Sequence, residues 1–331
     1  MLLLLVAAIA TLAVSMGVGQ YHLGLSEAVD IIVRWFTDGP DDSLKEKIVF
    51  TQRVPRGLMA LVVGGGLAVA GAVMQSMLHN PLADPYTTGV SSGASLGAAL
   101  YVVLGIGILP LGDTVGLVSN AFVMSLIPAA IVVLLSVYRR VTATTMILVG
   151  IGVMYVFSAF TQTLKVIATP QQMEMLYMWQ LGSLTQCTVQ DVCAVFAVVA
   201  VCTALLYSLR TDLNLLSVGD KAAVTMGTDP WKVRVLCLVI VSFMTSVMVS
   251  FTGVIGFVGL VAPQMIRLVM GSDNRFLIPA SAMFGALFLL VCDCLSRVVS
   301  SVGLPVGILT AAIGSPIFLY MLVKRSRRHT I

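Results

Sequence analysis

Residues 89–93 form the pattern G-x-S-x-G, in which the central serine of a hydrolase can act as a nucleophile. In such enzymes Ser91 would follow a strand of a parallel sheet and would need a histidine later in the chain. The later histidine here is His329, in the charged C-terminal tail, and His79 is the one nearest to this stretch. Neither position suits a catalytic base on a facing helix. We therefore interpret the serines of this stretch as small, weakly polar contacts between helices.

Two charged residues, Asp293 and Arg297, stand four positions apart at the end of an apolar stretch. This spacing predicts an ion pair on one helix face. A functional alternative is that Asp293 orients Arg297 at an external mouth. Ion-coupled carriers keep ionisable groups at membrane depth, and the scarcity of such groups here argues against ion coupling.

Other motifs that would bind a cofactor or a metal are not found in the sequence. There is no G-x-x-x-x-G-K-[ST] for the phosphates of ATP and no H-E-x-x-H for zinc. The six cysteines and three histidines are not spaced like metal ligands. We interpret the cysteines as small core residues, and we expect no catalytic residue, cofactor or metal site in this chain.

The composition indicates which elements must position the charged residues. Of 331 residues, 58% are hydrophobic and 10% are charged, whereas soluble domains carry about 25% charged residues. The mean hydropathy is +1.02, and apolar stretches of about 18 or more residues, each long enough to cross a bilayer, recur along the chain. We predict an all-α polytopic membrane protein that forms one transmembrane domain over residues 1–331.

We predict ten spans, the first of them a membrane helix rather than a signal peptide because it lacks a basic start. Placing both termini in the cytoplasm puts most of the 19 lysines and arginines inside, as the positive-inside rule requires. The ten predicted spans are 1–19, 54–77, 86–109, 115–137, 143–166, 190–209, 232–251, 254–270, 276–296 and 304–323.

Two connections between spans are long enough to have structure of their own. The external segment 20–53 is expected to contain a short amphipathic helix around 25–36. The internal segment 210–231 has a helix start signal at Asp212 and a break at Gly227, which predicts one or two short helices outside the bilayer. The apolar positions of this internal segment indicate a docking surface rather than a plain connector.

The sequence NPLADP, residues 80–85, breaks the chain between the second and third spans. Helices end before proline because its ring restricts the preceding residue. A polar, broken segment near membrane depth is tolerated where it is buried in protein or lines a cavity. We predict that Asn80 and Pro81, with Gln75 in the preceding span, belong to a pathway or gate.

Glycine is abundant, with 29 residues, and several glycines recur at helical spacing within the spans. Small faces of this kind allow the backbones of membrane helices to approach closely. We predict tight helix packing at Gly64, Gly71, Gly93 and Gly97.

Five long stretches of the chain resemble the FecCD-type permeases, which are membrane subunits of ATP-binding-cassette (ABC) importers for iron-siderophores, haem and cobalamin. The stretches cover nearly the whole chain in order and are residues 53–98, 178–185, 215–227, 253–297 and 304–324. The resemblance implies a type II ABC importer fold with ten spans, in a homodimer that encloses one central path. It also implies two separate ATPase subunits, which bind ATP and magnesium, and an extracytoplasmic substrate-binding protein.

The resemblance further implies an outer rim of arginines that pair with glutamates of the binding protein. Arg53, Arg56 and Arg297 match those positions. Arginine suits this role because its planar guanidinium presents two donors to a carboxylate. The alternative is that these long side chains reach the membrane interface for solvation alone.

In members of this family the loop before the seventh span forms coupling helices that sit in a cleft of the ATPase. The matching residues here lie within 213–227, where Gly219-Asp220 stands in place of the Gly-Glu that is frequent in relatives. A cytoplasmic gate in the cobalamin branch matches Thr142, Ala143 and Thr144. The residues predicted to couple to the ATPase are Leu215, Leu216, Gly219, Asp220, Met226 and Gly227.

The predicted function is import of an iron chelate, or of a related metal complex such as cobalamin, by alternating access. Haem or an oxyanion such as molybdate is the alternative within the family. A secondary transporter driven by an ion gradient is the alternative of another class, and an intramembrane hydrolase is a third. The expected location is the cytoplasmic membrane of a prokaryote, in contact with lipid and with no nucleic acid.

Overall fold

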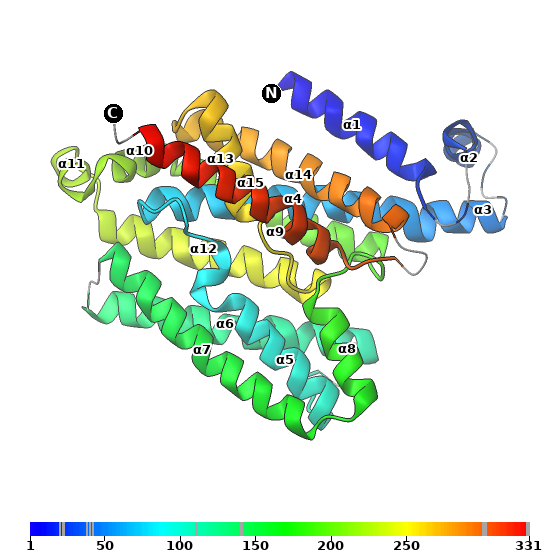
Figure 1. The fold of residues 1–331 in the computed structure, drawn as a ribbon, viewed down its shortest axis with the longest axis horizontal. Coiled ribbons are helices and arrows are strands. Elements are labelled where there is room, and N and C mark those ends of the chain that lie inside the picture. The colour runs from blue at the N-terminus through cyan, green and yellow to red at the C-terminus, as the bar shows by residue number, and fades with distance from the viewer. Residues whose placement is uncertain are drawn as a thin grey trace.

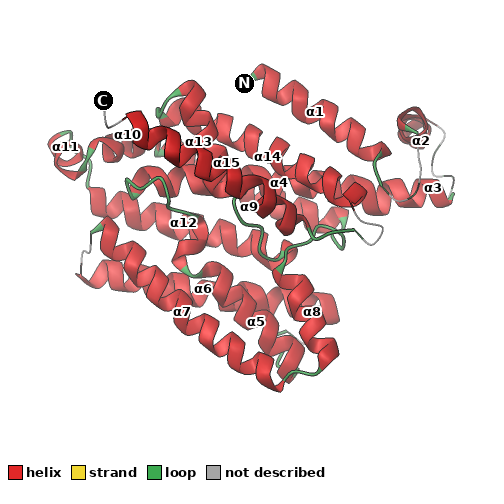
Figure 2. Ribbon diagram, viewed as in Figure 1, coloured by secondary structure: helices red, strands yellow, loops and turns green. Residues whose placement is uncertain are grey.

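The computed structural model describes residues 1–19, 21, 24–37, 39, 41, 43–109, 112–139, 142–299 and 303–328. Helices account for most of these residues, and no strand occurs among them (Figure 2). The all-helical class predicted from the composition is confirmed. Positions outside the described residues include His329 and, in the predicted external segment, 20, 22, 23, 38, 40 and 42.

Each of the ten predicted spans contains one principal helix. Among the described residues, seven helical segments are long and apolar enough to cross a membrane, and α1, α5 and α13 are shorter apolar helices. The number of ten spans and the cytoplasmic placement of both termini stay predictions. The ten helices are α1 (Leu2–Gly17), α4 (Val54–Met77), α5 (Val90–Leu104), α6 (Asp113–Arg139), α7 (Ala143–Ile167), α9 (Val189–Ser208), α12 (Pro230–Thr252), α13 (Val258–Met270), α14 (Asn274–Val299) and α15 (Val306–Arg328).

Shorter helices lie in the connections between the long helices. The expected amphipathic helix is present as α2 (Leu25–Thr37). The predicted internal segment forms α10 (Arg210–Val218) and α11 (Asp220–Thr225), two short helices as expected. These two lie at the opposite end of the molecule from α2 (Figure 1).

The helix that contains the second predicted span begins earlier than predicted. A short α3 (Leu44–Lys47) continues through a π-helical turn (Ile48–Arg53) into α4, so one helical segment runs from Leu44 to Met77. Residues up to 53 were assigned from the sequence to the external segment, and no helix was predicted at 44–53. The structure instead uses these residues to extend the helix beyond its apolar part.

A helix that the sequence analysis did not predict, α8 (Pro170–Gln180), follows α7. Its start has a local signal, because the Thr169 hydroxyl accepts a hydrogen bond from the backbone N–H of Gln172. The Gln172 side chain in turn accepts from the backbone N–H of Thr169, at 2.9 Å. This reciprocal pair, followed by proline at the first helical position, is a standard helix start.

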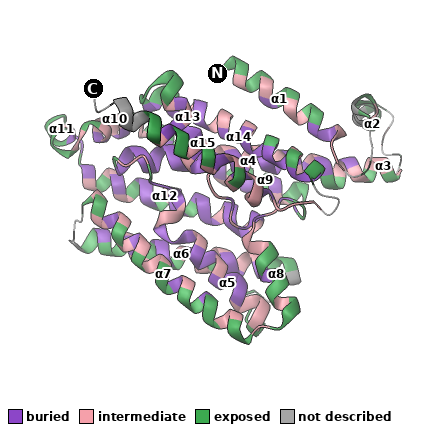
Figure 3. Cartoon of the chain, viewed as in Figure 1, coloured by how far each residue is buried: buried purple, intermediate pink, exposed green. Residues whose placement is uncertain are grey.

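The helix α4 is the central element of the fold, with 18 of its 24 residues buried (Figures 1 and 3). It packs against α9, α12, α13 and α14. A Cβ atom on Gly64 would lie 2.4 Å from the carbonyl oxygen of Gly285, and one on Gly71 would lie 1.9 Å from that of Gly259. These glycines therefore bring helix backbones into direct contact, as predicted.

A second group of helices, α5 to α8, packs on one side of the α4 group (Figure 1). Here too glycine sets the distance, since a Cβ on Gly93 or Gly97 would lie within 2.5 Å of a carbonyl oxygen of α6. The third predicted span, 86–109, is shortened to α5. A 3-10 turn (Pro85–Thr88) precedes it, and Gly89 and Gly105 bound it with positive φ angles of 84° and 67°.

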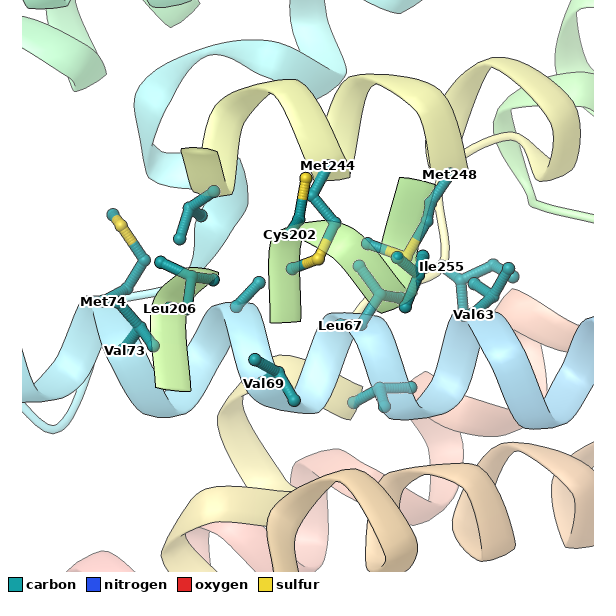
Figure 4. Packing of buried hydrophobic residues seen from close by; sticks show 14 of the residues in the cluster. Val63, Leu67, Val69, Val73, Met74, Cys202, Leu206, Met244, Met248 and Ile255 are labelled. Atoms are coloured by element: carbon teal, nitrogen blue, oxygen red, sulfur yellow. The ribbon is translucent and has the colours of Figure 1, made fainter. Parts of the chain in front are cut away.

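The hydrophobic core lies between α4, α9 and α12 (Figure 4). Leu67 of α4 lies near Met248 of α12, and Cys202 of α9 lies beside Met244 of α12. Of the six cysteines, four are buried and all are free thiols. The interpretation of the cysteines as small core residues holds for these four.

The chain breaks between α12 and α13, where the sequence places Gly253. Gly253 has a φ of 68°, and Phe257, immediately before α13, also has a φ of 68°. A positive φ in a bulky aromatic residue is costly and persists only where packing enforces it. The predicted span 254–270 therefore holds a helix that starts at Val258, four residues later than predicted.

Candidate functional site

Arg53 ends the π-helical turn before α4, and its side chain is buried, with 5% of the residue exposed. Its guanidinium donates hydrogen bonds to the backbone carbonyls of Met16 and Tyr21. Met16 lies in the last turn of α1, and Tyr21 lies in the segment that follows this helix. Arg53 therefore holds the end of α1 against the start of α4, and the sequence analysis did not foresee this internal role.

Arg56 and Arg297 share one carboxylate, that of the fully buried Asp293. The Nε of Arg56 donates to Oδ1 of Asp293 at 2.7 Å, and its Nη2 donates to the hydroxyl of Ser296 at 3.0 Å. Arg297 pairs with the other oxygen of Asp293 and donates to the carbonyl of Ser15 at 3.2 Å. The predicted ion pair between Asp293 and Arg297 is confirmed, and Arg56 joins it from another helix.

The three arginines line one cavity of about 610 Å³ at the α2 end of the molecule. Its other walls come from α8, from the end of α12 and from the segment before α15, with Trp179, Gln186 and Leu304 among them. None of the described residues that line it is acidic. Arg56 and Arg297 share the single carboxylate of Asp293, and Arg53 bonds to backbone carbonyls only. The cavity therefore has an excess of positive charge and suits an anionic group.

Arg297 has a further donor that the described chain leaves without a partner. Its Nε is buried and forms no hydrogen bond with any described residue. A buried donor without a partner is unfavourable by about 1–3 kcal/mol. Of the three arginines, Arg297 therefore has the clearest capacity for one more acceptor.

The short helices α10 and α11 combine anchored and exposed apolar residues. Leu216 is 1% exposed and packs into the core, and Leu215 packs against the core from its edge. Val218, Val224 and Met226 are instead 62% to 73% exposed. An apolar surface of this kind at the end of a helical bundle suits a protein partner.

Gly219 separates the two short helices, and Gly227 ends the segment, both with positive φ angles of 132° and 86°. Such angles favour glycine because a side chain would clash with the backbone. Asp220 begins α11 and pairs with Arg234 of α12, with Nη1 and Oδ2 2.8 Å apart. This hydrogen-bonded pair lowers the pKa of the Asp220 carboxyl below its ordinary value.

The second half of the NPLADP break is enclosed by protein, whereas Leu82 is 50% exposed. Ala83, Asp84 and Pro85 are buried, and the Asp84 carboxylate accepts a hydrogen bond from the backbone N–H of Tyr86 at 2.8 Å. Asn80 caps the turn by accepting from the N–H of Leu82 at 2.9 Å. The predicted break is confirmed, and its place in a pathway or gate stays a prediction.

Gln75, assigned from the sequence to the same gate, lies in the last turn of α4 and is 3% exposed. Its amide donates to the carbonyl of Gly259 at the start of α13. The predicted gate residues Thr142, Ala143 and Thr144 lie at the start of α7, where the Thr142 hydroxyl accepts from the N–H of Thr145. Thr142 is thus a helix cap, and the gating function of this stretch stays a prediction.

Ser91 lies in the first turn of α5, beside a small hollow of about 260 Å³. The described residues that line this hollow are serines, a threonine, glutamines, Met154 and Val254, without a histidine or an acidic group. No general base therefore faces Ser91 among the described residues of this hollow, and the interpretation of Ser91 as a packing residue stays a prediction.

Comparisons with known proteins give one consistent result. The FecCD transport family matches residues 4–324. A putative ABC transporter permease protein of Methanocaldococcus jannaschii is 34% identical over 321 residues, which cover 94% of this chain and 90% of that protein. A cobalamin import system permease protein of Halobacterium salinarum is 39% identical over 282 residues, which cover 85% of this chain and 74% of that protein.

A solved structure has the same fold over nearly the whole chain. It is described as an inward-facing conformation of a putative metal-chelate type ABC transporter. The TM-score is 0.85 at 29% sequence identity, and the match covers 97% of both chains.

Proposed function

The chain belongs to the FecCD transport family, and we propose that it is the permease subunit of an ABC importer for a metal chelate. The observation that carries the proposal is the family match over residues 4–324. It is supported by the pair of short helices, α10 and α11, whose exposed apolar residues suit a partner at one end of the bundle.

The proposed assembly has two copies of this chain, two separate ATPase subunits and an extracytoplasmic binding protein. Ten spans cross the cytoplasmic membrane of a prokaryote, with both termini inside. The chain has no G-x-x-x-x-G-K-[ST] sequence, so ATP and magnesium are assigned to the partner ATPase. Alternating access follows if the ATPases bind the two conformations of the permease with different affinity, because only a differential affinity can shift a conformational equilibrium.

The proposed docking site for the binding protein is the arginine-lined cavity. Its excess of positive charge suits carboxylates, and the fork of a guanidinium can bind both oxygens of one carboxylate. Arg56 and Arg297 are the contact residues, since Asp293 holds both side chains at the cavity wall. Arg53 supports the site from behind through its bonds to the end of α1.

The proposed cargo is an iron chelate or a corrinoid, with haem or molybdate as the alternatives within the family. The cytoplasmic gate is assigned to residues 142–144, and Gln75, Asn80 and Pro81 to the pathway or its gate. A small polar residue can narrow a path without closing it permanently, which suits a gate that must open.

The test is ligand uptake into liposomes that contain the permease, its ATPase and the loaded binding protein. Ferric siderophore, cobalamin, haem and molybdate are each supplied in radiolabelled form. We expect ATP-dependent uptake of one of them and no uptake without the ATPase. Uptake that persists without the ATPase and follows an ion gradient would make the protein a secondary transporter instead.

A further inference from the structure

The side-chain amide of Asn214 in α10 forms hydrogen bonds to the rest of the bundle through both its nitrogen and its oxygen. Its Nδ2 donates to Oδ1 of Asp273 at 2.7 Å. Its Oδ1 accepts from both the backbone N–H and the side-chain Nδ2 of Asn274, each at 2.8 Å. Asn274 is fully buried at the start of α14. The amide of Asn214 therefore fixes α10 to the end of a long helix.

The hydrogen bonds continue from Asn274 to the last turn of α4. The hydroxyl of Ser76 donates to Oδ1 of Asn274 at 3.0 Å, and Arg267 of α13 donates to the same hydroxyl at 3.2 Å. Arg267 also donates to Oε1 of Gln75. Four elements, α10, α14, α4 and α13, are thereby joined through side chains.

From the same turn of α4 the bonds reach the NPLADP break. Gln264 of α13 donates to Oε1 of Gln75 at 2.9 Å and to the backbone carbonyl of Pro81 at 3.1 Å. The amide of Gln75 donates to the carbonyl of Gly259 at 3.2 Å. Gln264 thus links the side chain of Gln75 to the break after α4, and Gln75 itself bonds to the first turn of α13.

A separate set of bonds ties α11 to the same turn. Asp220 of α11 pairs with the guanidinium of Arg234 through both of its carboxylate oxygens. The Nε of Arg234 then donates to the backbone carbonyl of Met77 at 2.8 Å. The side chain of Arg234 is 6% exposed and that of Asp220 is 55% exposed, so this link runs from a half-exposed carboxylate to a buried guanidinium.

Hydrogen-bonded links from both short helices therefore reach three consecutive residues, Gln75, Ser76 and Met77, which we name the coupling turn. The next turn of the chain contains Asn80 and Pro81. Buried hydrogen bonds are directional and strong at low dielectric, and a buried polar group that loses its partner is unfavourable. A shift of α10 or α11 must therefore move the coupling turn or break buried bonds.

We infer that the coupling turn transmits movement of α10 and α11 to the break at residues 80–81 and to the start of α13. This inference rests on the proposed function, in which an ATPase moves the two short helices. Asn214, Asn274, Ser76 and Gln75 are positioning residues in this link. They act on the pathway through hydrogen bonds, without contact to the cargo being required.

If these hydrogen bonds only stabilise the fold, a different result is expected. Loss of a purely stabilising hydrogen bond lowers the amount of folded protein, but each folded complex still imports the same amount of cargo per ATP hydrolysed. Loss of a transmitting bond lowers the cargo imported per ATP. Claims of coupling need this kind of direct evidence, because neighbouring contacts alone do not establish it.

The first experiment uses proteoliposomes and the radiolabelled compound (ferric siderophore, cobalamin, haem or molybdate) that the wild-type complex imports. It measures the amount of this compound imported per ATP hydrolysed for Asn274→Ala and for a matched control, Asn120→Ala. Asn120 is also buried, at 1% exposed, and joins α6 to the α5 end through its amide, far from α10. We expect the ratio to fall about 3-fold to 10-fold for Asn274→Ala and to stay unchanged for Asn120→Ala. An unchanged ratio in both variants, or an equal fall in both, overturns the inference.

The second experiment does not need the ATPase, so it separates this inference from the proposed function. Amide hydrogen exchange is measured on the full-length chain in detergent, with Asn214→Ala as the variant. We expect exchange to increase at residues 80–84, although Asn214 does not contact them, because the chain of bonds to Gln75 is loosened. Unchanged exchange at 80–84 overturns the inference. The proposed function has its own test, because it would be contradicted if the wild-type complex showed no ATP-driven uptake.

Discussion

At the scale of single residues, one buried carboxylate organises the charged end of the molecule. Asp293 lies between Arg56 and Arg297 and is fully buried. An isolated buried charge is costly, but one with paired and hydrogen-bonded partners is tolerated. The cavity beside them keeps an excess of positive charge, which supports its proposed contact with carboxylates of a binding protein.

Arg56→Lys tests this docking site. Lysine keeps the charge but cannot reach Asp293 and Ser296 at once, because its ammonium lacks the planar fork of arginine. We expect the affinity of the reconstituted complex for its binding protein to fall about tenfold, measured with the complex in nanodiscs. Arg275→Lys is the control, since Arg275 is exposed at the start of α14, at the opposite end of the helix that carries Asp293 and Arg297. Equal losses in both variants would contradict the assignment.

The pair between Asp220 and Arg234 predicts a pH dependence. Its hydrogen bonds hold the pKa of Asp220 below the ordinary value of 3.8 in the folded chain. The stabilisation is therefore present above pH 3.8 and is lost as the pH falls through the lowered pKa. The Asp220 side chain is 55% exposed, so solvent keeps the contribution to about 1 kcal/mol or less.

Asp220→Asn checks this expectation by denaturant unfolding of the purified chain. The difference in unfolding free energy between wild type and variant should be present at pH 7 and should shrink as the pH falls below 3.8 and through the lowered pKa of Asp220, because the wild-type carboxyl then becomes protonated. A difference that persists at low pH would show that the charge of Asp220 is not its cause.

At the scale of elements, close helix packing depends on glycine where two backbones touch. A Cβ on Gly71 would lie 1.9 Å from the carbonyl oxygen of Gly259, a backbone atom that cannot turn away. The helix α13 carries Gln264 and Arg267, so the α4–α13 contact also positions the coupling turn. Loss of this contact should therefore affect both stability and transport.

Gly71→Ala should lower the unfolding free energy by about 1–3 kcal/mol, the usual cost of overpacking. The measurement is thermal unfolding in detergent, followed by the loss of helical signal. Gly152→Ala is the control, because no atom lies within 4 Å of a Cβ built at Gly152 in α7. Alanine favours a helix over glycine there, so a loss of stability equal to that of Gly71→Ala would contradict the packing argument.

At the scale of the whole molecule, the predicted internal and external segments lie at opposite ends (Figure 1). The α2 end holds the arginine-lined cavity, and the other end holds α10 and α11. The buried residues gather between these ends, with exposed residues on the outer helix faces (Figure 3). This distribution suits two different partners, a binding protein at one end and an ATPase at the other.

Met226→Glu tests the proposed ATPase contact. Met226 is 70% exposed, so a glutamate there should not disturb folding, whereas it would place a charge in an apolar interface. We expect the affinity for the ATPase to fall about tenfold or more, as at interface hot spots, measured by pull-down of purified subunits at graded concentrations. Val29→Glu, at an exposed valine of α2, is the control and should leave this affinity unchanged.

Local features of the sequence by themselves determined most of the helices. Long apolar stretches must be helical in a bilayer, because every backbone polar group needs a partner within the segment. Pro81 indicates the break after α4, because proline restricts the backbone of the residue before it. Gly253 indicates the break between α12 and α13, because glycine readily adopts a positive φ angle. The capping pair of Thr169 and Gln172 was an equally local signal, and α8 could have been predicted from it.

Only the tertiary structure decided which distant side chains meet. Arg56 and Asp293 are 237 positions apart, and the bond between Ser76 and Asn274 spans 198 positions. The resemblance places Arg53 at an outer rim that contacts a binding protein, and only the structure shows that packing against α1 buries its side chain against backbone carbonyls. Spacing along a helix reports neighbours three or four positions away. Partners on other helices depend on how the glycine faces bring the helices together, and this arrangement is a property of the packed bundle.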